Sequence, residues 1–244
     1  MVNKRNLAVV AIFVSITTFV LINALSVHRQ GEGVSHYSDV ESKEQTQFKK
    51  IHYFASKNAQ PFTSFSADLL DIEGESGSEK LFFTSSSGKL RSDQQWINWT
   101  GDEGTFNTIT QELFLKGDVV VTALEGTHKS DSVYYNGLKD FLEAKGKVLS
   151  KVLDLKTLDI LNITSNYVSS WIAEKRTLFL GNVIGSLKRK RRYEGGIDFS
   201  AERMELNQLK SLLTLENNVK LDRNNYHLES QKGEVFLGNF NKKL

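Results

Sequence analysis

The 244-residue chain contains no cysteine and a single proline, Pro61. The absence of cysteine excludes disulfide bonds, thiol catalysis and cysteine-ligated zinc. With one proline, the turns must be built mainly from glycine, asparagine and aspartate. Neither sign of charge dominates, because 31 basic and 29 acidic residues give a net charge of +2. This balance provides no general case for nucleic-acid binding.

Motifs of the common enzyme classes are also missing. None of the five histidines (His28, His36, His52, His128 and His227) lies within four residues of another, so a metal site is unsupported. The chain has no G-x-S-x-G nucleophile motif and no G-x-x-x-x-G-K-[ST] phosphate-binding loop. Acidic pairs such as Asp71 and Glu73 could form a glycosidase dyad, but such residues at loop ends are usually solvated. We therefore expect no enzymatic activity, no metal and no cofactor.

The longest apolar run, Leu7–Val27, contains no charged residue. As a helix it would span about 31 Å, which matches the hydrocarbon thickness of a bilayer. Lys4 and Arg5 precede it, so we expect residues 1–6 in the cytoplasm and residues 7–27 as a transmembrane anchor. The alternative is a cleaved secretory signal, but the best cleavage site has the large Ile22 where a small residue is wanted. In both cases residues 28–244 are exported.

Residues 28–60 are polar with little periodicity, and we expect them to form a stalk before a domain at 61–244. In that domain, residues 112–121 alternate between apolar and polar side chains, as in a strand with one buried face. The segment 135–161 is the best helical competitor. Gly137 and Gly146 interrupt it, so strands are preferred there.

A degenerate repeat of about 30 residues runs through the domain. Each unit has a small residue, a small or apolar residue three positions later, a large residue two positions after that, and then G-x-V. The units are Gly101, Gly104, Phe106, Gly117, Val119; Ser130, Val133, Tyr135, Gly146, Val148; Asn166, Ser169, Trp171, Gly181, Val183; Ala201, Met204, Leu206, Asn217, Val219; and a last partial copy Ser230, Gly233, Val235. The glycine or asparagine before each valine tolerates positive φ at a bend. Such a repeat predicts stacked hairpins that bury one face, in a sandwich, jelly roll or β-solenoid.

The repeat resembles the LptA/LptC family of lipopolysaccharide-export bridge proteins, which share an OstA-like β domain. Residues 96–136, 171–183 and 212–240 carry the resemblance, through an L-x-L-x-G-x-V pattern such as Leu113–Val119. The resemblance implies an open, twisted β-jellyroll whose apolar interior takes the acyl chains of lipopolysaccharide. The anchor and stalk match the single-pass inner-membrane member of the family, with its C-terminal domain in the periplasm.

Partners are implied by the same resemblance. Such a protein accepts lipopolysaccharide from an inner-membrane ABC transporter and passes it to a soluble periplasmic bridge protein, LptA in that family, by pairing of strand edges. An apolar slot would offer the acyl chains an environment close to the membrane they left. The lining residues are expected on the inward face of the repeat units: Leu115, Val119, Val121, Val133, Tyr135, Leu142, Val148, Phe179, Val183, Leu215 and Val219. In a closed sandwich the same residues would be ordinary core.

The strongest charge cluster is Lys188, Arg189, Lys190, Arg191 and Arg192. It is expected either to be a solvated hairpin tip that guards a sheet edge or to contact phosphate of lipid head groups. Two other functions remain open for the whole chain. One is an anchored periplasmic scaffold whose β domain binds only protein partners, and the other is a carbohydrate-active β-helix enzyme.

Overall fold

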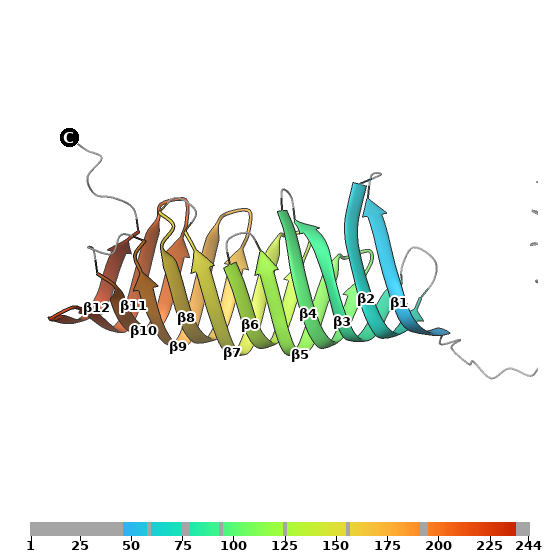
Figure 1. Cartoon of the computed structure of the whole chain (residues 1–244), viewed down its shortest axis with the longest axis horizontal. Coiled ribbons are helices and arrows are strands. Elements are labelled where there is room, and N and C mark those ends of the chain that lie inside the picture. Colours follow the sequence, from blue (N-terminus) through green and yellow to red (C-terminus); the bar gives the residue numbers. More distant parts are fainter. Residues whose placement is uncertain are drawn as a thin grey trace, which may run out of the picture. The chain divides into compact units, whose positions relative to one another are not determined.

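The computed structural model describes residues 46–57, 60–74, 79–92, 95–123, 126–154, 157–190 and 195–237, and these residues form one β-sheet. Its strands are β1 (Thr46–Lys57), β2 (Gln60–Glu73), β3 (Lys80–Ser92), β4 (Gln95–Asn107), β5 (Glu112–Ala123), β6 (Gly126–Asn136), β7 (Phe141–Leu153), β8 (Ile160–Trp171), β9 (Arg176–Lys188), β10 (Ile197–Asn207), β11 (Leu212–Arg223) and β12 (Tyr226–Phe236). Each strand pairs antiparallel with the next one in sequence (Figure 1). The sheet is open, with β1 and β12 at its two ends. The all-β prediction is therefore confirmed, in a form consistent with a jellyroll.

The odd-numbered strands bend near their middle. Backbone φ is positive at Lys50 in β1, Ser85 in β3, Gly117 and Asp118 in β5, Gly146 in β7, Gly181 and Asn182 in β9, and Asn217 and Asn218 in β11. From the β4–β5 pair to the β11–β12 pair, the register shifts at the same level, as between Lys116 and Val119, which marks a bulge in each of these pairs. The glycine or asparagine of each repeat unit thus lies at a bend, as its position before the valine predicted.

Gly146 shows why glycine occupies this position. Its φ is +98°, and a Cβ added there would meet the Asp131 carboxylate at 2.0 Å. Asp131 comes from the facing bend of β6 and accepts a hydrogen bond from the backbone N–H of Lys147 at 3.4 Å. Gly117 has the same relationship to Asp102 on β4. The bend is therefore stabilised by a side chain from the preceding strand.

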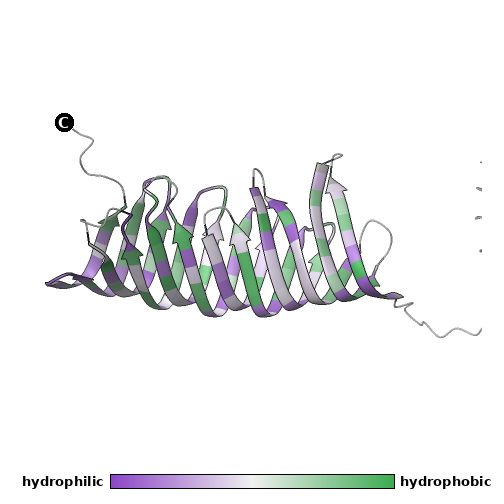
Figure 2. Ribbon diagram, in the orientation of Figure 1, coloured by the Kyte–Doolittle hydropathy of each residue, from purple (hydrophilic) through white to green (hydrophobic). Residues whose placement is uncertain are grey.

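The bends fold the sheet into two facing layers (Figure 1). We call the strand halves that meet at the turns 108–111, 137–140, 172–175 and 208–211 wall 1, and the other halves wall 2. Phe62 of wall 2 lies 6.5 Å from Phe106 of wall 1, ring centre to ring centre. Apolar and polar residues alternate along the strands (Figure 2), and the apolar set faces the space between the walls.

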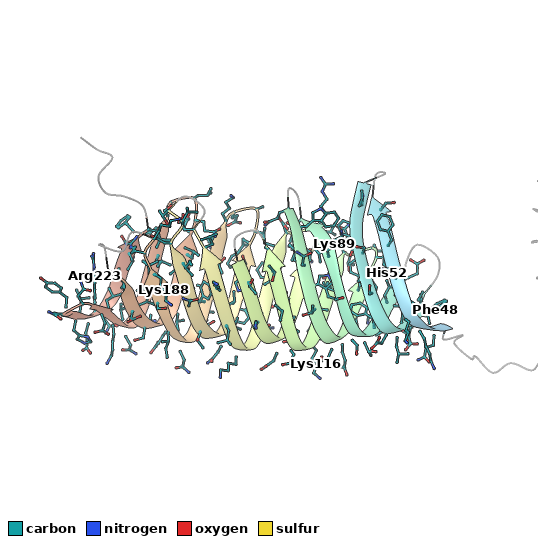
Figure 3. All side chains as sticks on the ribbon, viewed as in Figure 1. Phe48, His52, Lys89, Lys116, Lys188 and Arg223 are labelled. Carbon is teal, nitrogen blue, oxygen red and sulfur yellow. The ribbon has the colours of Figure 1, made fainter. Side chains whose placement is uncertain are left out.

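The side opposite the bend, where the strand ends of the two walls approach each other, is called the mouth. Lys116 lies on the bend side of the sheet, while Phe48 and Arg223 mark its two ends (Figure 3). At the mouth, Ser92 Oγ at the end of wall 2 donates a hydrogen bond to Asp140 Oδ1 in a wall 1 turn. The hydroxyl of Tyr135 donates to the same carboxylate oxygen at 3.0 Å.

The sheet starts earlier in the chain than expected. Residues 46–57, placed by the sequence in the stalk, form β1, and β2 already begins at Gln60. Ile51, Tyr53 and Ala55 of β1 alternate with exposed residues, so this polar segment does carry a weak period of two. Residues 28–45 and the expected anchor at 7–27 lie outside the described residues. Within the described residues, no helix is long and apolar enough to cross a membrane.

The third repeat unit has a different register from the predicted one. The first three positions of this unit are occupied by Ser165, Val168 and Ser170. Each lies one residue before the residue expected there, which was Asn166, Ser169 or Trp171. Ser165 lies opposite Val148 and Ser170 lies opposite Thr177. The repeat pattern placed Trp171 at the large-residue position of this unit, which Tyr135 and Leu206 occupy in two of the others. Trp171 instead packs outside, 5.4 Å from the Phe141 ring and beneath the Arg176 guanidinium at 4.0 Å.

The segment 135–161 contains β7 and the start of β8, so the preference for strands over a helix is confirmed. Longer connections follow β7 and β9, at residues 154–159 and 189–196.

Candidate functional site

The space between the two walls is the candidate functional site. All eleven residues expected to line a slot lie there, and each is at most 4% exposed: Leu115, Val119, Val121, Val133, Tyr135, Leu142, Val148, Phe179, Val183, Leu215 and Val219. They come from five different strands, β5, β6, β7, β9 and β11, and join one continuous cluster of buried residues. Their inward orientation follows from the alternation along each strand. A role in contacting lipid stays a prediction for each of them.

An aromatic group fills the N-terminal part of this interior. The ring of Phe65 lies 4.8 Å from that of Phe83, and Phe83 lies 5.6 Å from Trp99. Tyr53 of β1 stacks on Phe65 at 4.9 Å. The repeat pattern begins at Gly101 and therefore missed these residues. The aromatic residues Phe62, Phe65, Phe82 and Phe83 in two strand-like segments were the signal that could have found them.

The interior is packed with the protein's own side chains. Phe179, Leu115 and Leu215 have no exposed surface. The cavity between the wall ends at the mouth measures only about 60 Å³ and is lined by residues such as Ile97, Val121 and His128. An acyl chain can therefore enter only if the walls separate or side chains move aside, because a filled core has no room for added methylenes.

Polar groups interrupt the apolar interior near the mouth. Ser170 and Thr177 form a cross-strand pair, and their hydroxyl oxygens are 3.0 Å apart. At the corresponding position, other repeat units have an apolar pair, Phe106 with Leu113 or Leu206 with Leu213. His128 Nδ1 lies 2.8 Å from Ser150 Oγ, and burial lowers the pKa of this histidine to about 4. The His128 ring is therefore neutral at pH 7.

The basic run divides into different environments. Lys188 and Lys190 are exposed. Arg189 instead forms an ion pair with Asp159 at 2.9 Å, and its guanidinium also donates to the carbonyls of Leu237 at 3.1 Å and Phe236 at 3.0 Å. These contacts join the end of wall 2 to the last residues of wall 1. Arg189 thus has a structural role at the mouth, and Arg191 and Arg192 lie outside the described residues.

A depression of about 910 Å³ lies on the outer surface of wall 2, across β6 to β11. Small side chains such as Ser186, Thr164 and Ser200 line it, together with the exposed Lys129 and Lys151. Leu149 and Ile184 are 43% and 61% exposed there. Sequence reasoning did not identify this feature, since it depends on side chains that six strands bring together.

The described residues contain no group of three or more His, Asp or Glu side chains that could hold a metal ion. Several polar groups near the mouth are paired with each other, as in Tyr135 with Asp140 and Arg189 with Asp159. The arrangement is suited to enclosing apolar groups.

No protein-family model matches the chain, and no curated protein matches it. Among solved structures, the chain is similar to LptH from Pseudomonas aeruginosa, described as the LptA-homologous periplasmic component of the lipopolysaccharide transport device. The TM-score is 0.42 and the identity 12%, over 50% of this chain and 82% of that one.

Proposed function

We propose that this protein is a non-enzymatic carrier of lipopolysaccharide, whose acyl chains are held between the two walls. The observation that carries the proposal is the continuous apolar interior, which runs from β2 to β12 inside a sheet that is open at both ends. The resemblance of the repeat to lipopolysaccharide-export bridge proteins supports the same ligand.

The physical argument concerns the cost of moving hydrocarbon through water. Each methylene taken out of water gains about 0.8 kcal/mol, so an acyl chain of twelve or so carbons cannot cross an aqueous space unescorted. A protein interior of valine, leucine and phenylalanine offers it a similar environment to the bilayer. Because the interior is filled in this structure, loading requires the walls to part at the mouth. Lipid contacts then replace the contacts between Phe179, Leu115 and their neighbours.

We further propose that Leu7–Val27 anchors the chain in the inner membrane, with residues 1–6 in the cytoplasm and the β domain in the periplasm. An inner-membrane ABC transporter would then deliver the lipid and supply the energy of transport. Phosphate groups of the lipid would contact the exposed Lys188 and Lys190 near the mouth.

Transfer to a soluble LptA-like bridge protein would use an end strand of the sheet. The outer edges of β1 and β12 pair with no strand of the described residues. Phe54 on β1 is 63% exposed, and Tyr226 on β12 is 80% exposed. Such an edge has free backbone donors and acceptors and can be extended by a strand of a partner.

The lipid role is tested by photo-crosslinking in intact cells. A photoreactive residue at Val121 or Phe179 should capture lipopolysaccharide, while the same residue at Lys116, on the outer surface near the bend, should not. Thermal unfolding of each variant checks that the fold survives the substitution. Capture only at Lys116, with folded variants at the interior positions, would contradict the proposal.

A second candidate is an anchored scaffold that binds proteins only. The full packing of the interior favours it, because a closed core needs no ligand. Delipidated protein distinguishes the two functions. Saturable binding of purified lipopolysaccharide supports the carrier, while its absence, together with capture of envelope proteins, supports the scaffold.

A further inference from the structure

Three of the four wall 1 turns expose a large aliphatic side chain at the same position. Ile109, Leu138 and Leu209 are the second residues of the turns 108–111, 137–140 and 208–211, and they are 59%, 63% and 60% exposed. The turn 172–175 has Ala173 at this position. Successive turns are two strands apart, which places neighbouring tips roughly 10 Å from each other. We call these four turns the turn row.

The turn row is held in a defined conformation. Asn107 Oδ1 accepts hydrogen bonds from the backbone N–H groups of Ile109 and Thr110, both at 3.0 Å. Asn136 and Asn207 cap the second and fourth turns in the same way. Backbone hydrogen bonds also join consecutive turns, from Gly137 to Gln111, Ile172 to Asp140 and Gln208 to Lys175. These hydrogen bonds therefore fix the turns while the aliphatic side chains of Ile109, Leu138 and Leu209 stay exposed to solvent.

The charged residues next to the exposed aliphatic side chains favour contact with an anionic surface. Lys139 follows Leu138 directly, Lys210 follows Leu209, and both lysines are exposed. The acidic residues of the row have partners inside the protein. Asp140 accepts hydrogen bonds from Tyr135 and Ser92, and Glu174 pairs with Arg176 at 3.1 Å.

The preceding chain is long enough to place this row at a membrane. The uncharged run ends at Val27 and the sheet begins at Thr46, so residues 28–45 connect them. Fully extended, this connection reaches about 60 Å, several times the height of a wall. A domain on such a tether has access to the membrane surface with any of its faces.

We propose that the turn row is a membrane-contact surface, with Ile109, Leu138 and Leu209 inserted among the lipid head groups and Lys139 and Lys210 at the phosphates. Exposed aliphatic tips flanked by lysines fit this interfacial environment. The inference rests on the anchor in the proposed function. It adds that the mouth, of which the turn row is one margin, opens toward the bilayer from which a lipid would be taken.

The absence of native cysteine allows a direct test. The full chain with one cysteine at Ile109, Leu138 or Leu209 is labelled with an environment-sensitive fluorophore and reconstituted into vesicles of phosphatidylethanolamine and phosphatidylglycerol. Nitroxide-labelled lipids should quench these labels at least threefold more than labels at Lys116 or Lys147, which lie near the bend. In the triple variant Ile109→Asp, Leu138→Asp, Leu209→Asp, a label at Thr110 should lose this quenching while circular dichroism remains unchanged.

Equal quenching at the turn row and the bend would overturn the inference. If the chain does not float with the vesicles, the anchor fails as well. If it floats while the turn row stays in water, as expected for a protein-docking surface, only the membrane contact fails. Binding of lipopolysaccharide by the same variants in detergent reports on the carrier function separately.

Discussion

Arg189 and Asp159 form an ion pair of 2.9 Å in which the two side chains are only 13% and 6% exposed. The second carboxylate oxygen of Asp159 accepts the backbone N–H of Lys190 at 2.8 Å. Because Arg189 also binds the carbonyls of Phe236 and Leu237, one guanidinium connects the ends of both walls at the C-terminal part of the mouth.

Replacing Arg189 with glutamine should lower the free energy of unfolding by about 2–4 kcal/mol, since the buried Asp159 carboxylate would lose its counter-charge. Urea denaturation measures this change. The matched control is Lys188→Gln, at an exposed neighbouring position, which should change stability by less than about 0.5 kcal/mol. Similar small effects for both variants would mean that Arg189 does not hold the mouth closed.

Gly146→Ala should destabilise the protein by about 1–3 kcal/mol, because alanine is strained at a φ of +98° and its Cβ would collide with Asp131. Gly101→Ala is the control. Gly101 has no positive φ, and a Cβ there would make only ordinary contacts with Leu115 and Val119, the nearest at 3.5 Å. Thermal unfolding should therefore show a clear loss for the first variant alone.

His128 should make stability depend on pH. Its pKa is about 4 in the folded protein and about 6.5 when unfolded, so the unfolded chain binds more protons between these values. Stability is fully present above pH 6.5 and is lost as the pH falls toward 4, by at most about 1.4 kcal/mol per pH unit. His128→Gln should flatten this slope.

An NMR titration gives the internal comparison for His128. The pKa of the exposed His227 is raised by its hydrogen bonds to Asp222 and Glu229. The two imidazole signals should therefore titrate on opposite sides of 6.5. Coincident titration curves would show that His128 is not buried in a neutral form.

Phe179→Ala should cost about 3–5 kcal/mol, because this ring has no exposed surface and its removal leaves a cavity between the walls. Phe114→Ala, on the outer face of β5 where the ring is 43% exposed, should cost much less. Equal losses in urea denaturation would argue against a packed interior. Addition of lipopolysaccharide should restore part of the lost stability only if the space between the walls accepts lipid.

Local spacing along the chain identified much of the fold. Alternation marks Leu113, Leu115, Val119 and Val121 as one face of a strand, and this information is carried by neighbouring residues. The glycine or asparagine before each valine marks the bend, since few other residues adopt positive φ without strain. The strands, their antiparallel order as hairpins and the inward set of residues could therefore be predicted from the sequence.

The third unit shows where this reasoning fails. Trp171 matched the large-residue position of the repeat, but a shift of one position moves every side chain to the opposite face. Pairing of β8 with both β7 and β9 places Ser170 inside and Trp171 outside, next to Phe141 and Arg176. The register is decided by the residues that each strand pairs with in its neighbours. These partners cannot be identified from the residues adjacent in the sequence.

By itself, the sequence determined that the chain forms stacked, bent hairpins with one apolar face, because those features depend on spacing within each unit. Only the tertiary structure decided that the two walls pack together into a filled interior, that Arg189 connects the wall ends and that Ile109, Leu138 and Leu209 stand in one row. Each of these depends on residues from different hairpins, and their contacts exist only once the sheet has folded over on itself.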